Sequence, residues 1–330
     1  MTERVAVLGD GAWGTALAIS LAANGASVHL WSAFPDYAAR LARTRENVKF
    51  LPGVGIPEAV EITAEAACAF EGASLALAVV PTQYIRPTLA RIALSVPEGL
   101  PVASCAKGLE LGTLKRPTEI LREVFPGSPV AVVSGPSHAE EVARGLPTSV
   151  VAASGDAATA ARFQAALAGP RLRVYTSADV LGVELGAALK NVVAIAAGIA
   201  AGLELGDNTL AALITRGSAE MARLGAALGA DARTFAGLSG VGDLIATCTS
   251  RHSRNRRTGE RLARGEALEA ILASTEGVAE GVPTTRAAVE LARARDVELP
   301  IAEMLARVFG GEIAPREAVL ALMTRPTRAE

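Results

Sequence analysis

The feature that most constrains the fold of this chain is a glycine-rich turn near its N-terminus. Residues 9–14 read Gly-Asp-Gly-Ala-Trp-Gly, follow the apolar run at residues 5–8 and open the helical pattern at residues 15–24. In this setting the first glycine permits a tight turn, the second lets a pyrophosphate approach the backbone, and the third lets helix and strand pack closely. The N–H groups at the helix start would face the diphosphate. The turn therefore predicts a dinucleotide site, and a glycine-rich turn without a ligand is the alternative.

The rest of the first half alternates short apolar runs with helical segments, which sets the expected fold class. The runs that we expect to form strands are residues 5–8, 28–31, 75–80, 102–105, 130–133, 149–152 and 172–175. Apolar strands separated by helices indicate a parallel sheet that is covered on both faces. From about residue 177 helical segments rich in Ala, Leu and Arg take over. We predict an α/β chain with a Rossmann-type doubly wound domain at residues 1–178 and an all-α, substrate-binding and catalytic domain at residues 179–330.

Composition excludes several classes of protein. The 330 residues suit two domains, at roughly 100–200 residues each. The formal net charge of −2 argues against nucleic-acid or membrane-surface binding. The apolar run at residues 192–203 is shorter than the ~18 residues of a membrane helix, so we expect a buried core helix and no integral membrane association. The N-terminus is interrupted too early for a signal peptide.

The cysteines, and the lack of metal-binding and nucleophile motifs, limit the kinds of catalysis to expect. The three cysteines share no CxxC spacing, and an odd number fits no closed disulfide framework. We expect them to be reduced, buried residues of a cytoplasmic protein. The sequence has no HExxH and no GxSxG pattern, which disfavours a catalytic metal and serine hydrolysis.

Lysine is rare in this chain and therefore informative. Only four of the 32 basic residues are lysine: Lys49, Lys107, Lys115 and Lys190. A lysine can give up a proton near neutral pH when its surroundings are tuned, whereas arginine effectively cannot. Lys190 precedes Asn191 in an apolar helical segment, where an unpaired charge is expensive to bury and burial lowers a lysine pKa. A lysine that snorkels to solvent is the alternative.

Other polar residues gather in turns. Lys107 follows a predicted strand, and doubly wound folds bind ligands outside the carboxyl ends of their strands. A solvated loop lysine is the alternative. Asp243, in a glycine-rich turn, could position an ammonium or a substrate hydroxyl, or cap a helix. The stretch at residues 247–257, which includes Ser253, Arg254 and Asn255, combines hydroxyls, an amide and guanidiniums and suits a phosphate group. Ser137 is a cap or a ligand contact, whereas we interpret His138 as structural and Arg256, Arg257, Arg261 and Arg264 as solvated.

The sequence leaves the choice between NAD and NADP open. Dinucleotide folds usually carry an acid after the second strand for a ribose diol, or a nearby arginine for a 2′-phosphate. Ser32 and Ala33 supply neither. Asp36 lies at about the right distance, but Pro35 before it indicates a new helix. Arg40, Arg43 or Arg45 could reach a 2′-phosphate.

Taken together, these motifs closely resemble the bacterial NAD(P)-dependent glycerol-3-phosphate dehydrogenase family from residue 5 to about residue 322. The matching segments are residues 9–16, 45–53, 80–83, 107–110, 134–141, 182–191, 211–217, 240–243, 253–257 and 278–281. The resemblance implies hydride transfer between a nicotinamide and C2 of dihydroxyacetone phosphate, giving sn-glycerol 3-phosphate for phospholipid synthesis. It also implies NAD or NADP as cofactor. The apolar helical domain favours a homodimer. The family often carries Arg or His where Ala33 stands, which leaves its usual NADPH preference open here.

The resemblance also implies roles for individual residues. Lys190 would be the proton donor and acceptor at the C2 oxygen. The substrate would be lined by Lys107, Gly135, Ser137, Asp243, Ser253, Arg254 and Asn255. The cofactor would be contacted by Gly9, Gly11, Ala12, Trp13, Gly14, Ala33, Lys107, Ala139, Arg254, Val278 and Glu280.

Two other functions compete with this one. A related hydroxyacid or ketopantoate reductase usually separates its active lysine and asparagine by several residues, whereas Lys190 and Asn191 are adjacent. Its carboxylate substrate would also leave the phosphate chemistry near Arg254 unexplained. A non-catalytic dinucleotide-sensing protein would need the glycine-rich turn but neither Lys190 nor Asp243.

Overall fold

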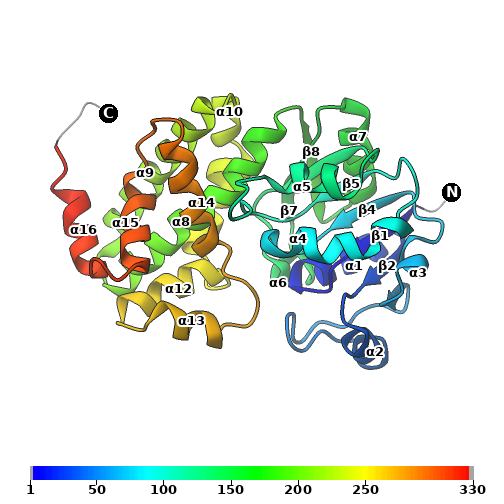
Figure 1. Cartoon of the computed structure of the whole chain (residues 1–330). Coiled ribbons are helices and arrows are strands. Elements are labelled where there is room, and N and C mark those ends of the chain that lie inside the picture. Colours follow the sequence, from blue (N-terminus) through cyan, green and yellow to red (C-terminus); the bar gives the residue numbers. More distant parts are fainter. Residues whose placement is uncertain (1–2, 327–330) are drawn as a thin grey trace. The chain divides into compact units, whose positions relative to one another are not determined.

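The computed structural model describes residues 3–326 and divides the chain into two compact units (Figure 1). The first unit comprises the residues up to Lys107 and Lys115–Glu184, and the second comprises Gly108–Leu114 and the residues from Leu185 onward. The division at Glu184 falls inside one continuous helix, α8 (Val180–Gly202).

The first unit is built on one eight-stranded sheet. Its strands run in the order β3-β2-β1-β4-β5-β6-β7-β8, and all neighbours are parallel except β6 and β7. The order of the first six strands is that of a doubly wound dinucleotide-binding sheet. The strands are β1 (Arg4–Leu8), β2 (Ser27–Trp31), β3 (Val60–Thr63), β4 (Leu75–Ala78), β5 (Val102–Ser104), β6 (Val130–Ser134), β7 (Thr148–Ala153) and β8 (Leu172–Ser177).

The predicted α/β class is confirmed, with two differences. The sheet contains one antiparallel pair, in which Val132 lies opposite Ala153. Strand β3 was not expected from the sequence, because Glu61 and Thr63 interrupt its apolar residues. This strand lies at the sheet edge, where only Val60 is fully buried.

Helices cover both faces of this sheet. Along β1, Val5 and Val7 join a core with Leu17 of α1, while Ala6 and Leu8 join a second core with Ile85 of α4. Two cores on alternate residues of one strand explain why the strands are apolar throughout. The helices of this unit are α1 (Ala12–Ala23), α2 (Pro35–Thr44), α3 (Ala66–Phe70), α4 (Thr82–Leu89) with the 3₁₀ turn η1 (Ala90–Ser95), α5 (Pro117–Val124), α6 (Ala139–Val142) and α7 (Ala157–Leu167).

The described residues of the second unit form regular structure only as helices. After α8 they form α9 (Gly206–Ala227), α10 (Ala232–Phe235), the turn η2 (Leu238–Gly242), α11 (Asp243–Thr249), α12 (Arg254–Ala263), α13 (Leu268–Ser274), α14 (Gly281–Arg293), α15 (Pro300–Phe309) and α16 (Pro315–Met323). Within the described chain, α8 alone is long and apolar enough to cross a membrane, but 83% of its apolar window is buried. This burial is that of a core helix.

Glycines let the helices of the second unit approach α8 closely. A Cβ on Gly198 of α8 would overlap the carbonyl oxygen of Arg256, and one on Gly259 of α12 would overlap that of Ile195. A Cβ on Gly186 would overlap the carbonyl oxygen of Ser239 in η2. These contacts fix the backbone on both sides of Lys190, which α8 carries between Gly186 and Gly198.

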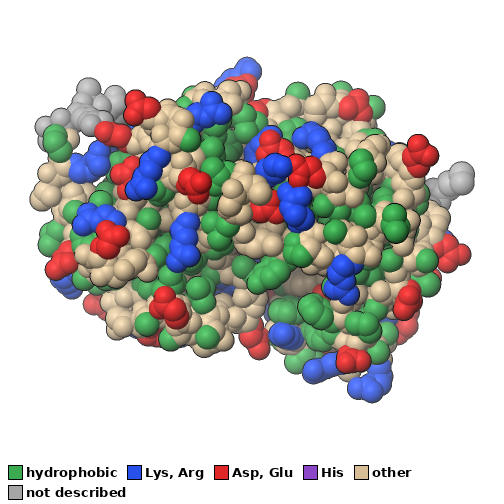
Figure 2. Space-filling view, in the orientation of Figure 1, with side chains coloured by type: hydrophobic (Ala, Val, Ile, Leu, Met, Phe, Trp, Pro, Cys, Tyr) green, Lys and Arg blue, Asp and Glu red, His purple; other side chains and the backbone are tan. Residues whose placement is uncertain are grey.

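The surface agrees with the near-neutral charge. On the face that Figure 2 shows, basic and acidic side chains are interspersed over each unit. One expectation was wrong: Cys68 is exposed, although Cys105 and Cys248 are buried. The short helix α3 turns Ala69 and Phe70 inward and leaves Cys68 on its outer side.

We expect Gly259→Ala to destabilise the second unit by about 1–3 kcal/mol, because its methyl group has no space against the backbone of α8. Gly155→Ala is the matched control, since a Cβ there meets nothing within 4 Å. Thermal melting of both variants checks this. Equal melting temperatures for the two variants would contradict the close helix crossing.

A buried glutamate makes stability depend on pH. Glu220 of α9 is 8% exposed, and its carboxyl oxygens accept hydrogen bonds from the backbone N–H of Ile301 at 2.9 and 3.2 Å. Burial raises the pKa of this carboxyl from 4.5 to about 7. A raised pKa means that the neutral acid stabilises the fold fully below about pH 4.5 and that this contribution disappears as pH rises through about 7.

We therefore expect wild-type stability relative to Glu220→Gln to fall by up to about 3 kcal/mol between about pH 4.5 and pH 8. The amide stays uncharged across this range and lacks the effect. Thermal unfolding of both proteins over this range measures the difference, with the exposed Glu290→Gln as control. Parallel curves for wild type and Glu220→Gln would refute the assignment.

Candidate active site

The glycine-rich turn between β1 and α1 has the geometry of a pyrophosphate cradle. Gly9 has φ +123°, and a Cβ there would lie 2.8 Å from the carbonyl oxygen of Val79. A Cβ on Gly14 would overlap the carbonyl oxygen of Gly9, whereas one on Gly11 meets nothing within 4 Å. Gly11 is also the N-cap of α1 and offers no side-chain cap to the first N–H groups. Gly9 and Gly14 thus close the turn tightly, while the backbone at Gly11 is open to a ligand.

A predicted cofactor residue outside the turn, Ala139, packs against Trp13 within it. Ala139, which begins α6, packs in one apolar cluster with Ala16, Ala12 and Trp13. The indole N–H of Trp13 is buried and has no hydrogen-bond partner among the described residues. An orphaned donor next to an open helix N-terminus fits a polar ligand such as a dinucleotide.

The residues after β2 differ from those of most dinucleotide folds, which carry an acid or an arginine there. Ala33 packs against the apolar core of the first unit. Asp36 is exposed in the first turn of α2, whose N-cap is Phe34. Arg45 donates to the carbonyl oxygens of Ile56, Pro57 and Val60, so its guanidinium is committed to the backbone.

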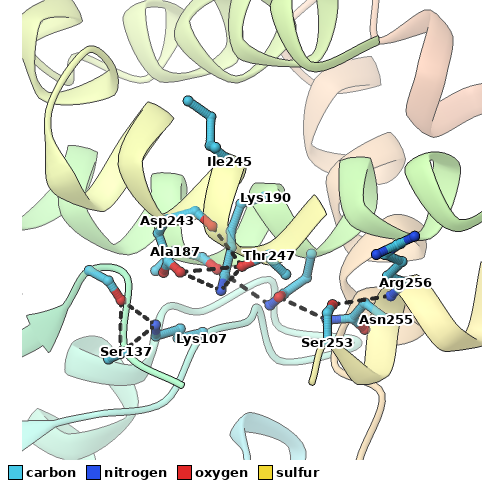
Figure 3. A network of polar contacts seen from close by, with 12 residues as sticks. Lys107, Ser137, Ala187, Lys190, Asp243, Ile245, Thr247, Ser253, Asn255 and Arg256 are labelled. Carbon is cyan, nitrogen blue, oxygen red and sulfur yellow. Dashed lines mark hydrogen bonds and ion pairs between the residues drawn. The ribbon is translucent and has the colours of Figure 1, made fainter. Parts of the chain in front are cut away.

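The first polar group gathers at the carboxyl ends of β5 and β6 (Figure 3). The Lys107 ammonium donates to the carbonyl oxygen of Gly135 at 2.8 Å and to Ser137 Oγ at 3.2 Å, and Ser137 Oγ donates to the same carbonyl at 2.8 Å. Gly135 has φ +143°, and a Cβ there would crowd the backbone of Val150 at 3.0 Å. The three predicted residues therefore form one cluster with a half-buried cation.

The second polar group is a buried ion pair in the second unit (Figure 3). The Lys190 ammonium lies 2.8 Å from Asp243 Oδ1 and donates to Thr247 Oγ1 at 2.7 Å. The Thr247 hydroxyl in turn donates to the Asp243 carbonyl oxygen at 2.6 Å. The side chains of Lys190 and Asp243 are 7% and 2% exposed. Asp243 therefore holds an ammonium, and the N-cap of α11 is Gly242.

Two asparagines extend this second group toward α14. Asn255 Nδ2 donates to Asn191 Oδ1 at 2.8 Å, and Asn255 Oδ1 accepts from the N–H of Gly281 at 3.0 Å. Ser253 is the buried N-cap of α12, where its hydroxyl accepts from the N–H of Arg256 at 3.2 Å. This capping contact and a ligand contact can share one hydroxyl, because Ser Oγ also carries a donor hydrogen.

Arg254 lies against the segment that carries two predicted cofactor residues. A Cβ on Gly277 would overlap Nη1 of Arg254, so the guanidinium lies next to the chain that leads into Val278 and Glu280. Arg254 is exposed. Of the arginines that we interpreted as solvated, Arg257 and Arg264 are exposed, while Arg256 and Arg261 pair with acidic neighbours.

The cysteines do not supply a nucleophile to either group. Burial raises the pKa of the Cys105 and Cys248 thiols to about 12, which keeps both protonated at neutral pH. Among residues 3–326 no three His, Cys, Asp or Glu side chains are grouped as metal ligands. The polar groups described here are therefore built around lysine ammonium groups.

The chain joins a doubly wound sheet with an open glycine-rich turn to a helical unit that buries a lysine–aspartate pair. This combination defines the class of dinucleotide-dependent oxidoreductases with an all-helical second domain. Comparison with known proteins gives the family. The profile of the NAD-dependent glycerol-3-phosphate dehydrogenase N-terminus matches residues 4–160, and that of the C-terminus matches residues 179–320. The chain belongs to the NAD(P)-dependent glycerol-3-phosphate dehydrogenase family, as its motifs indicated.

Individual relatives agree over the full length. A glycerol-3-phosphate dehydrogenase [NAD(P)+] of Moorella thermoacetica is 50% identical, with 100% of this chain and 98% of the relative covered. One from Prosthecochloris aestuarii is 46% identical over 99% of each chain. The crystal structure of glycerol-3-phosphate dehydrogenase from Coxiella burnetii has a TM-score of 0.94 at 37% identity, covering 98% of this chain and 99% of that one.

The sequence placed Thr247 in the stretch suited to a phosphate rather than beside Lys190, and it gave no role to Asp10. Thr247 lies four residues after Asp243, so the helical period placed both on one face of α11 and could have revealed it. Asp10 occupies a variable position of the glycine-rich turn, and its neighbour Ser32 lies 22 residues away, so no local spacing indicates their contact.

We expect Thr247→Val to lower kcat by roughly 10- to 100-fold, because a hydrogen bond to the Lys190 ammonium is lost. The affinity for the cofactor should not change, and Thr247→Ser should recover most of the rate. Thr249→Val is the matched control, since that hydroxyl donates only to the carbonyl of Ile245 in its own helix. A fully active Thr247→Val would show that this hydroxyl does not hold Lys190 in its working position.

Proposed function

We propose that the chain interconverts dihydroxyacetone phosphate and sn-glycerol 3-phosphate by hydride transfer with NAD(P)H. The observation that carries the proposal is the buried Lys190 ammonium, held by Asp243 and Thr247 in a chain of this family. In this proposal residues 1–178 bind the dinucleotide and residues 179–330 bind the substrate and carry the catalytic lysine.

Lys190 is the proposed acid and base. A nicotinamide, when bound, would supply a hydride to C2 of the ketone, which would place negative charge on the C2 oxygen. The Lys190 ammonium stabilises that charge and delivers a proton to the oxygen, so that C2 gains a hydride and its oxygen gains a proton. In the oxidative direction the neutral amine accepts the proton. Asp243 keeps the ammonium oriented, and Thr247 holds it from a second side.

The substrate phosphate supplies binding energy away from the reacting carbon. We assign it to Ser253, Arg254 and Asn255, because a guanidinium beside a hydroxyl and an amide matches phosphate oxygens. Lys107, with Gly135 and Ser137, is the proposed second cation for substrate and cofactor. Holding the phosphate orients C2 and lowers the entropic cost of hydride transfer.

The cofactor is assigned to the glycine-rich turn and its neighbours. The backbone at Gly11 and the N–H groups that open α1 would bind the pyrophosphate, and the orphaned Trp13 indole N–H fits a polar group there. Ala139, Val278 and Glu280 are the further proposed contacts. We also propose that the protein is a cytoplasmic homodimer that supplies glycerol phosphate for glycerophospholipid synthesis.

Spectrophotometric oxidation of NADH and of NADPH with dihydroxyacetone phosphate tests the proposed reaction. We expect oxidation of at least one cofactor that depends on this substrate, and no comparable rate with a 2-ketoacid. Absence of oxidation of both cofactors would reject the function. A faster reaction with ketopantoate would favour the reductase alternative.

Arginine substitutions separate the two lysine roles. We expect Lys190→Arg to lose roughly 1,000-fold in kcat, since arginine keeps the charge but cannot readily deliver a proton. Lys107→Arg should lose only about 10-fold in kcat/KM, because that site mainly needs a cation. Lys115→Arg, an exposed lysine paired with Glu123, is the control.

Cofactor titration of each lysine variant distinguishes lost chemistry from a lost fold. Lys190→Met, which matches the length of lysine without its charge, should bind cofactor normally and be nearly inactive. Wild-type turnover in Lys190→Arg or Lys190→Met would rule out the proton-transfer role.

A further inference from the structure

A carboxylate lies at the end of β2 although neither residue that follows this strand is acidic. Asp10, in the glycine-rich turn after β1, reaches across to Ser32, which comes directly after β2. Ser32 Oγ donates to Asp10 Oδ2 at 2.6 Å and accepts from the N–H of Phe34 at 3.2 Å. Ser32 is fully buried and Asp10 is 8% exposed. The acid that dinucleotide folds usually carry on the second strand is therefore delivered here from the first turn.

A hydrogen-bond network through Asn47, Thr15 and Tyr37 fixes the backbone of Asp10. Asn47 Nδ2 donates to the backbone carbonyl of Asp10 and to Thr15 Oγ1, both at 2.7 Å. The Tyr37 hydroxyl of α2 in turn donates to Asn47 Oδ1 at 2.6 Å. These bonds hold the backbone of Asp10, so a substitution of its side chain leaves them in place.

Burial and polar contacts act in opposite directions on the pKa of the Asp10 carboxyl. Burial raises the pKa of the Asp10 carboxyl, while the hydrogen bond from Ser32 and the charge of Lys49 act in the opposite direction. The Lys49 ammonium lies 4.9 Å from the Phe50 ring centroid. Arg45 is bound to backbone carbonyls, and Arg40 and Arg43 have exposed side chains on α2.

We propose that Asp10 determines the cofactor preference of this chain and selects NADH over NADPH. Its carboxylate would accept a hydrogen bond from a ribose 2′-hydroxyl, whereas a 2′-phosphate would bring like charges together, which is strongly unfavourable. The inference takes from the proposed function only that the glycine-rich turn binds a nicotinamide dinucleotide. It goes beyond that function by naming the residue that discriminates between the two cofactors.

Calorimetric titration of the full chain with ADP-ribose and with 2′-phospho-ADP-ribose at pH 8 isolates the adenosine end of the cofactor. We expect the wild type to bind ADP-ribose at least about 10-fold more tightly. Asp10→Asn should reduce this ratio by about 10-fold or more, mainly by tightening the binding of 2′-phospho-ADP-ribose. The ratio of kcat/KM for NADH and NADPH should change in the same direction.

Asp36→Asn is the matched control, because it removes the same charge from the exposed first turn of α2. It should keep the wild-type ratio. Asp10→Ala is the second variant, read beside a melting curve, and should also lose the preference.

Three results would overturn the proposal. The first is a wild type that binds 2′-phospho-ADP-ribose as tightly as ADP-ribose or more tightly, and the second is an unchanged ratio in both Asp10 variants. The third is an equal change in Asp36→Asn, which would indicate a general charge effect. A wild type that binds ADP-ribose but does not reduce dihydroxyacetone phosphate would overturn the proposed reaction and leave this preference standing.

Discussion

The buried ion pair between Lys190 and Asp243 is the interaction on which the chemistry of the second unit depends. Burying two charges is costly, and their attraction offsets the cost only when the geometry is good and the remaining donors find partners. The 2.8 Å contact and the hydroxyl of Thr247 meet both conditions. Removing either partner would leave a buried charge uncompensated, so the pair constrains structure as well as chemistry.

The ion pair between Lys190 and Asp243 forms because neighbouring backbone segments approach the backbone of α8 closely. At Gly186 there is space for the η2 turn, which leads directly into Asp243. Gly198 and Gly259 allow α12 to pack closely against α8. Small residues at these crossings bring Asp243 within hydrogen-bonding distance of Lys190. The apolar composition of α8, which by itself resembles a membrane helix, is explained by this dense packing.

The sequence predicted those features that follow from local pattern. Apolar runs located most strands, and the GxGxxG spacing predicted a turn whose glycines the structure finds tight at Gly9 and Gly14 and open at Gly11. Strand β3 was missed because polar residues alternate with apolar ones over its four residues, so that it has no continuous apolar run. Cys68 was wrongly expected to be buried, since composition does not tell which side of the short helix α3 faces the core.

Long-range contacts could not be predicted in the same way. The sequence left it open whether Asp243 positions an ammonium, positions a substrate hydroxyl or caps a helix. Only the fold brings it to Lys190, 53 residues away. The contact between Asp10 and Ser32 depends on two parallel strands placing their ends together. The roles of the individual site residues stay predictions that rest on this geometry and on membership of the family.

Chemical rescue is the most direct test of the central claim that Lys190 transfers the proton. Lys190→Ala is assayed for dihydroxyacetone phosphate reduction with and without added methylamine, with cofactor binding measured in parallel. We expect almost no turnover without the amine and a rate that rises with the concentration of methylammonium. Turnover at the wild-type rate in Lys190→Ala without any amine would contradict it.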